Sequence, residues 1–182
     1  TLLVGASWPV RHIEAYANRR DGVRVLGNRG ANGIDGLLST AYGLALRASA
    51  RTYALVGDVS FLYGAHGLLH GSERPANLTV VVLDNDGGGI FSQLEQGAPA
   101  FAPHFERVFG TPHGRDLWVV AESLGAPAVR VTSRDELQSA LRRTDALPGL
   151  HVIVVTTATR NSEATQLRDL AARVVQAITA QS

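Results

Sequence analysis

The sequence predicts an α/β fold, a three-layer sandwich around a mainly parallel sheet, and two observations support this. Short apolar, β-branched runs recur along the chain, and such continuous runs suit strands that are covered on both faces. Stretches with helical spacing of apolar residues separate these runs, as in a chain of strand–helix units. At 182 residues, we expect a single domain that spans 1–182.

The clearest buried-strand runs are TYALVG, LTVVVL and HVIVVT, while the two strands expected first in the chain have weaker patterns. The predicted strands, in order, are Leu2–Val4, Val23–Leu26, Thr52–Gly57, Leu78–Leu83, Ala128–Val131 and His151–Thr156. The predicted helices are Ile34–Arg47, Tyr63–Ser72, Asp116–Leu124, Asp135–Arg143 and Glu163–Ala180. The stretch rich in proline and glycine from Gly97 to Gly114 is expected to be one long loop.

The composition excludes several classes of function. A formal net charge of +1 gives no electrostatic case for binding nucleic acid or a membrane surface. The chain has no cysteine, methionine or lysine, so its 17 basic residues are all arginine; this excludes thiol nucleophiles, lysine Schiff bases and a Walker lysine. No apolar run approaches the roughly 20 residues of a membrane span and no leader is visible, so we expect a cytoplasmic protein. Because the chain opens on a strand pattern at Thr1, we expect it to be a piece of a longer enzyme.

Oxygen-bearing side chains follow two of the predicted strands. Asp58 comes directly after TYALVG, and Asn85 follows LTVVVL with one residue between, 27 positions further on. That spacing suits a strand–helix–strand unit, whose neighbouring parallel strands would lie about 4.8 Å apart with both carboxyl ends at one edge. Gly87 would let a backbone carbonyl approach as a third ligand. A carboxylate, an amide oxygen and a carbonyl suit Mg²⁺ holding a diphosphate.

The helix expected after Asp58 would direct its amino end at the same place, where free N–H groups favour a phosphate. Ser60 is expected to cap that helix or to bind a phosphate oxygen.

These residues also carry a family resemblance. Gly57-Asp58, followed at this distance by Asn85, is similar to the GDG…N motif of thiamin-diphosphate enzymes, although Val59-Ser60 departs from its second glycine. The variant GDVSFL resembles one branch of them, the SEPHCHC synthases of menaquinone biosynthesis. Further similar segments are 28–36 (NRGANGIDG), 85–92 (NDGGGIFS) and 109–113 (FGTPH), in the same order and over most of the chain.

The resemblance implies the thiamin-diphosphate-binding fold, of the type that holds the diphosphate, and a role for each matched position. Asp58, Asn85 and the Gly87 carbonyl would hold Mg²⁺. The expected cofactor-binding residues are Ile34, Gly57, Asp58, Ser60, Asn85, Ile90 and Phe91, with Ile34 bending the cofactor between its rings. The expected substrate-binding residues are Ser7, Arg11, Arg29 and Leu94. Arginine suits the carboxylates of isochorismate because its guanidinium pairs with them through two hydrogen bonds.

The activity implied is that of a transferase that decarboxylates 2-oxoglutarate and adds the remaining succinyl carbanion equivalent to isochorismate. The cofactor supplies the reactive carbon, and the protein supplies geometry and charge placement. The glutamate that activates the cofactor would come from the amino-terminal pyrimidine-binding domain of a partner subunit in a homodimer or homotetramer. The fragment alone is therefore expected to have no catalytic residue and to be inactive.

Other interpretations use some of the same residues. Asp84, Asp86, Gly89 and Glu95 imitate an EF-hand calcium loop, but such a loop follows a helix, whereas LTVVVL is typical of a strand. The glycines of 27–33 lack the GxGxxG spacing of a dinucleotide loop. His66 and His70 are spaced to share a metal on a helix but have no third ligand, and His113 is a modest active-site candidate. The remaining alternatives are another thiamin-diphosphate-dependent 2-oxoacid decarboxylase and a noncatalytic α/β module for subunit contacts.

Overall fold

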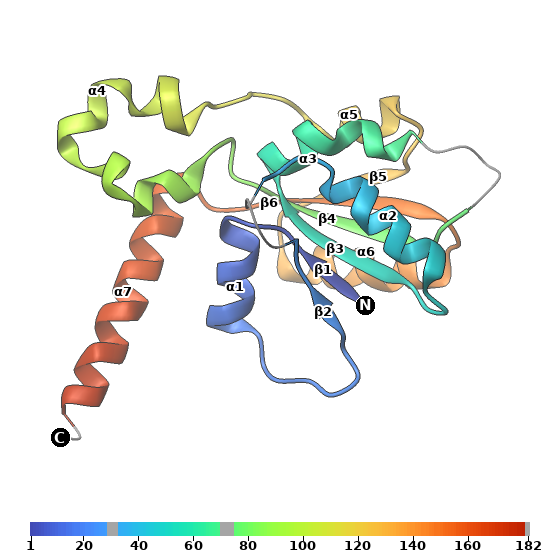
Figure 1. The fold of residues 1–182 in the computed structure, drawn as a ribbon, viewed down its shortest axis with the longest axis horizontal. Coiled ribbons are helices and arrows are strands. Elements are labelled where there is room, and N and C mark those ends of the chain that lie inside the picture. The colour runs from blue at the N-terminus through green and yellow to red at the C-terminus, as the bar shows by residue number, and fades with distance from the viewer. Residues whose placement is uncertain (29–32, 70–74, 181–182) are drawn as a thin grey trace. The chain divides into compact units, whose positions relative to one another are not determined.

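A computed structural model describes residues 1–28, 33–69 and 75–180 of the chain. The described residues form two compact units, one of 1–84 and 115–157 and the other of 85–114 and 158–180. Each unit is described by itself below, and Figure 1 gives the labels of the elements.

The first unit contains a six-stranded sheet in which every pair of neighbouring strands is parallel. The strand order is β2-β1-β3-β4-β6-β5. The strands are β1 (Leu2–Val4), β2 (Val25–Leu26), β3 (Thr52–Gly57), β4 (Leu78–Asp84), β5 (Ala128–Val131) and β6 (Leu150–Thr156). The order in which strands are added to the sheet reverses at β1: β2 is added on one side of β1, and β3 is then added on its other side. In such a sheet, ligands bind at the carboxyl ends of the strands where this reversal occurs.

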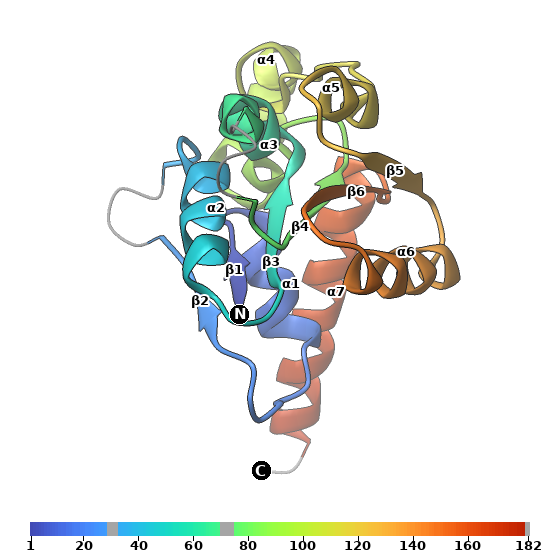
Figure 2. The same cartoon turned by 90° about the vertical axis from the view of Figure 1, so that its right-hand side faces the viewer.

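Helices cover both faces of this sheet, which confirms the predicted three-layer α/β sandwich. Along one face lie α2 (Leu37–Arg47), α3 (Asp58–Gly64), the short 3₁₀ turn η1 (Ala65–Leu68) and α5 (Leu117–Ser123). Along the other lie α1 (Trp8–Tyr16) and α6 (Arg134–Ala146), as Figures 1 and 2 show. The main core lies under the first group, where side chains of β3, β4 and β6 pack against α2 and α5.

The second unit consists of short helical turns and one long helix. After β4 come η2 (Gly89–Gln93), η3 (Glu95–Gly97), η4 (Pro99–Phe101), α4 (Ala102–Phe105) and the π-turn η5 (Glu106–Gly110). The chain returns to this unit as α7 (Arg160–Thr179), whose Thr159 side chain accepts a hydrogen bond from the Ser162 amide. The expectation of a single loop at 97–114 is therefore wrong, since helical turns occupy most of it.

The helices predicted from Asp116, Asp135 and Glu163 begin at Leu117, Arg134 and Arg160. The two other predicted helices also begin elsewhere than expected. The helix predicted from Ile34 begins at Leu37, because Gly36 has a left-handed backbone with φ 71° that cannot continue a right-handed helix. The helix predicted over 63–72 instead begins at Asp58, directly after β3, and becomes a 3₁₀ turn that ends at Leu68; residues 70–72 lie outside the described part. Within the described residues, no helix is both long enough and apolar enough to cross a bilayer.

Candidate functional site

In the first unit, acidic side chains stand at the carboxyl ends of neighbouring strands. Asp58 is the first residue of α3 and is 3% exposed, and Asp84 is the last residue of β4. The register of β3 on β4, with Gly57 opposite Leu83, brings these strand ends together. A carboxylate oxygen of Asp58 lies within 4.8 Å of one from Asp84. Because two carboxylates this close repel each other when both are ionised, the arrangement favours a cation.

The backbone around Asp58 differs from one expectation. The residue that caps α3 is Gly57, and the Asp58 carboxylate accepts a hydrogen bond from the Val59 amide at 2.7 Å. Ser60 lies within the helix, is 3% exposed and caps nothing. The prediction of Ser60 as a cap is therefore wrong, because the helix starts two residues before it.

In the second unit, Asn85 has an amide whose two ends are in contrasting environments. Its Nδ2 donates a hydrogen bond of 2.6 Å to Oε2 of Glu163, which is 8% exposed in the first turn of α7. Its Oδ1 is buried and has no hydrogen-bond partner in the part of the chain that the structure describes. A carboxylate only accepts hydrogen bonds, so the nitrogen must be the amide atom that faces Glu163. A buried acceptor left unpaired costs about 1–3 kcal/mol, and a bound cation would remove that cost.

Gly87 has a backbone that only glycine readily adopts. Its φ is 128°, and a Cβ built there would lie 2.1 Å from the carbonyl oxygen of Gly110. The adjacent amide of Gly88 donates to that same oxygen at 2.7 Å, so the two segments are held in contact. The Gly87 carbonyl accepts from the Gly89 amide at 2.9 Å, and a carbonyl oxygen has a second lone pair for a further partner.

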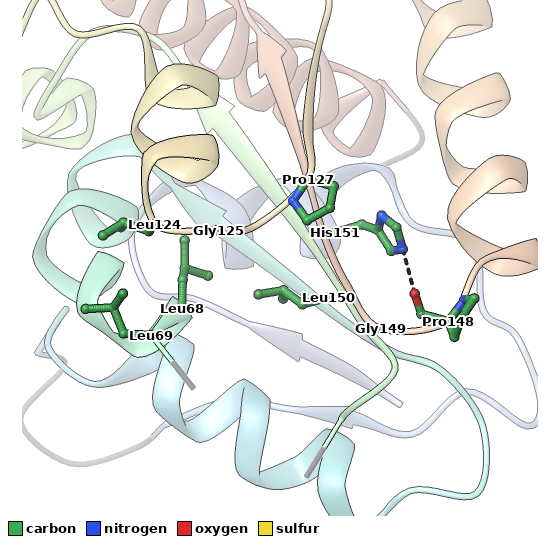
Figure 3. A pocket seen from close by; sticks show the side chains of 9 residues that line it. All are labelled: Leu68, Leu69, Leu124, Gly125, Pro127, Pro148, Gly149, Leu150 and His151. Atoms are coloured by element: carbon green, nitrogen blue, oxygen red, sulfur yellow. Dashed lines mark hydrogen bonds between the residues drawn. The ribbon is translucent and has the colours of Figure 1, made fainter. Parts of the chain in front are cut away.

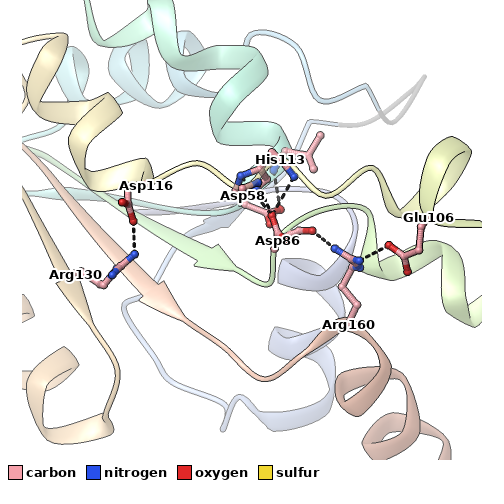
Figure 4. Close-up of polar contacts among 9 residues, drawn as sticks. Asp58, Asp86, Glu106, His113, Asp116, Arg130 and Arg160 are labelled. Carbon is pink, nitrogen blue, oxygen red and sulfur yellow. Dashed lines mark hydrogen bonds and ion pairs between the residues drawn. The ribbon is translucent and has the colours of Figure 1, made fainter.

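Asp86 joins this segment to the end of the 97–114 stretch. Its Oδ1 accepts from the backbone amides of His113 at 2.9 Å and Gly114 at 2.8 Å. Arg160 at the start of α7 donates to the Asp86 carbonyl and pairs with Glu106, as Figure 4 shows. These hydrogen bonds connect the backbone that carries Asn85 and Gly87 to residues 113–114 and to the start of α7, which belong to the same unit.

The remaining predicted residues are divided between the units. Ile90 and Phe91 lie on η2 and Leu94 directly follows it; Phe91 is 36% and Leu94 48% exposed, so both offer apolar surface to a ligand. In the first unit, Ile34 is half-buried ahead of α2. The structure therefore groups Ile90, Phe91 and Leu94 in one unit, and predictions that join them to residues of the other unit stay predictions.

Ser7 follows β1, next to the strand that leads to Asp58. Its φ of 72° is unusual for a residue other than glycine, and Arg11 Nη1 donates to its carbonyl at 2.8 Å. Arg11 therefore stabilises the turn at Ser7, and the other N–H groups of its guanidinium can donate to a ligand. Arg29 lies outside the described residues.

One alternative interpretation fails, and the metal pair of His66 and His70 stays untested. Asp84 ends a strand, as expected, so the calcium-loop interpretation fails. His66 is exposed on η1, and His70 lies outside the described residues.

A cavity of about 540 Å³ opens between Leu68 and the start of β6 (Figure 3). It lies at the amino ends of the strands, opposite to the end that carries Asp58.

Sequence reasoning missed two residues. Asp84 is not among the predicted site residues, although the sequence places it after a strand and beside Asn85. Glu163 was considered only as the start of a helix. Its hydrogen bond with Asn85 joins residues 78 positions apart, and no local sequence pattern indicates this contact.

Comparison with known proteins identifies the family. Residues 10–155 match the family model described as thiamine pyrophosphate enzyme, C-terminal TPP binding domain. The chain is 50% identical to the 2-succinyl-5-enolpyruvyl-6-hydroxy-3-cyclohexene-1-carboxylate synthase of Nocardia farcinica, over 95% of the chain and 31% of that protein. It is 48% identical to the synthase of that name from Rhodococcus erythropolis, again over 95% of the chain and 31% of the relative. The chain thus spans about a third of the length of these relatives.

Solved structures agree with the fold. Benzoylformate decarboxylase from Polynucleobacter necessarius superposes with a TM-score of 0.66 at 23% identity, over 87% of this chain and 30% of that one. A putative thiamin diphosphate-dependent enzyme from Mycobacterium smegmatis gives 0.68 at 20% identity, over 86% and 28%. At these identities the likeness concerns the fold alone.

Proposed function

Because this chain belongs to the thiamine pyrophosphate enzymes and is their C-terminal TPP-binding domain, we propose that it is the diphosphate- and metal-binding part of a SEPHCHC synthase. The whole enzyme would decarboxylate 2-oxoglutarate and join the succinyl unit to isochorismate, a step of menaquinone biosynthesis. The names of the relatives that match 95% of the chain support this choice of reaction. The observation that carries the metal site is Asn85, whose Nδ2 is anchored and whose Oδ1 is buried without a partner among the described residues.

The proposed cation is Mg²⁺, with the Asp58 carboxylate, the Asn85 amide oxygen and the Gly87 carbonyl as protein ligands. All three are oxygen donors, as a small hard cation requires, and three ligands leave positions for diphosphate oxygens and water. The buried Asp58 and the nearby Asp84 supply negative charge that favours a divalent cation. Gly87 has φ 128°, a conformation that glycine adopts readily, and glycine is common where a backbone closely approaches a ligand; this supports a role for its carbonyl.

The other predicted site residues would bind and orient the cofactor and the substrates. When bound, thiamin diphosphate supplies the carbon nucleophile that the decarboxylation needs. Gly57 and Ser60 would lie near its diphosphate, while Ile34, Ile90 and Phe91 would contact its apolar parts and exclude water. The proposed substrate contacts are Ser7, Arg11, Arg29 and Leu94, with the arginines pairing with carboxylates.

The activating glutamate, the partner subunit in a homodimer or homotetramer, and a cytoplasmic location belong to the same proposal. The likeness to relatives about three times as long supports a missing amino-terminal part as the source of that glutamate.

The test uses the full-length protein and measures Mg²⁺-dependent binding of thiamin diphosphate by tryptophan fluorescence. We expect Asp58→Ala to abolish retention of the cofactor. The control is Asp135→Asn, which removes one exposed negative charge on α6, and it should bind like the wild type. Equal binding by Asp58→Ala and the wild type would refute the metal site.

A second assay separates decarboxylation of 2-oxoglutarate from formation of the isochorismate adduct. Arg29→Ala should retain decarboxylation and lose adduct formation. Loss of both to the same extent would contradict the assignment of Arg29 to the second substrate. Decarboxylation by the wild type without any adduct would indicate a different 2-oxoacid enzyme.

A further inference from the structure

Glu163 has a buried carboxylate and is not among the predicted site residues. It is 8% exposed, lies in the first turn of α7, and accepts the Asn85 Nδ2 hydrogen bond at 2.6 Å. We propose that Glu163 is a positioning residue that fixes the Asn85 amide with its oxygen facing the cation. This inference rests on the proposed function, in which Asn85 is a metal ligand.

The amide needs such a partner because its terminal torsion is broad and roughly two-fold, so that oxygen and nitrogen can exchange places. In the exchanged orientation, Asn85 Oδ1 would face the Glu163 carboxylate, and two acceptors would meet without a proton between them. In the observed orientation, the Asn85 N–H donates to a carboxylate oxygen of Glu163 at 2.6 Å, so a donor meets an acceptor. Glu163 therefore selects the orientation in which Oδ1 is available to a metal.

Glu163 is itself held in place by the turn that carries it. The neighbouring Ala164 carbonyl accepts from Gln93 Nε2 at 2.7 Å, which joins α7 to η2. Arg160, one turn earlier, binds the Asp86 carbonyl and Glu106. Two anchors on either side of Glu163 thus fix α7 against the segment that follows Asn85.

The position near the start of a 20-residue helix also suits a negative charge, because the unpaired N–H groups of the first turn favour one. A carboxylate behind a metal ligand polarises that ligand as well as orienting it, and loss of such a partner typically costs 10–100-fold in metal affinity or activity. Glu163 lies beyond residues 10–155, where the family model matches, so the family description does not assign it a role.

The experiment measures the Mg²⁺ dissociation constant of the full-length protein with saturating thiamin diphosphate, by tryptophan fluorescence. We expect Glu163→Ala to raise this constant about 10–100-fold. Glu163→Gln keeps an acceptor oxygen for Asn85 Nδ2 and should recover most of the loss, to within about tenfold of the wild type. Glu122→Ala removes an exposed negative charge on α5 and should leave the constant unchanged. Melting curves of the metal-free proteins verify that each variant is folded.

A double-mutant cycle with Asn85→Ala tests whether Glu163 acts through Asn85. If it does, Glu163→Ala adds almost nothing in the Asn85→Ala background, because the effects of coupled residues are not additive. An equal loss in both backgrounds, or wild-type affinity in Glu163→Ala, would overturn the inference while the metal site stands. A wild-type protein without Mg²⁺-dependent cofactor binding would instead overturn the proposed function, and this inference with it.

Discussion

Replacement of Gly87 by alanine tests how the backbone of the second unit is built. The φ of 128° lies outside the range that side chains normally adopt, and this alone costs about 1–3 kcal/mol. The new Cβ would also meet the Gly110 carbonyl oxygen at 2.1 Å, a backbone atom that cannot swing aside. Overpacking of this kind costs typically about 1–3 kcal/mol more. We therefore expect Gly87→Ala to destabilise its segment by about 2–6 kcal/mol.

The assay is hydrogen exchange of the full-length protein without ligands, followed by mass spectrometry. The Gly88 amide, which donates to Gly110, should lose protection together with its neighbours in 88–94. Gly125→Ala is the matched control, since Gly125 has φ 81° but nothing within 4 Å of the added Cβ. It should pay the dihedral cost alone, about 1–2 kcal/mol in its own segment. If exchange in 88–94 is the same in Gly87→Ala as in the wild type, the close approach to Gly110 is wrong.

Three further predictions concern the first unit. Phe61 is fully buried in α3, and Phe61→Ala should lower the unfolding free energy by about 3–5 kcal/mol in urea titrations; a loss below 1 kcal/mol would contradict its burial. Ser133 caps α6 in a reciprocal pair with Glu136, so Ser133→Ala should cost about 1 kcal/mol in the same titrations, whereas Ser133→Asp should retain most of the stability. Burial, then the hydrogen bond to Asp145, raises the pKa of Tyr53 from 10.0 to about 12. Tyr53 should therefore stabilise the fold fully below pH 10 and lose this contribution as the pH rises through about 12, and Asp145→Asn should shift its phenolate absorbance to lower pH.

The strands were predicted more accurately than the helices. Thr52–Gly57 and Ala128–Val131 match the structure at both ends, because a β-branched run between polar residues leaves few alternatives. The helix expected from Tyr63 instead begins at Asp58, at the end of a strand. The start of this helix depends on where strand β3 ends, and the spacing of apolar residues does not indicate that point.

The sequence by itself determined the α/β class, the strand order along the chain and the places of Asp58 and Asn85 after two strands. Those features depend on residues close together in the chain, where periodicity and motif spacing are visible. Only the tertiary structure decided that Asp84 lies near Asp58, that Gly87 touches Gly110, and that Glu163 binds Asn85. These contacts join residues that are 23 to 78 positions apart. The packing of whole strands and helices brings them together, and this packing leaves no local mark in the sequence.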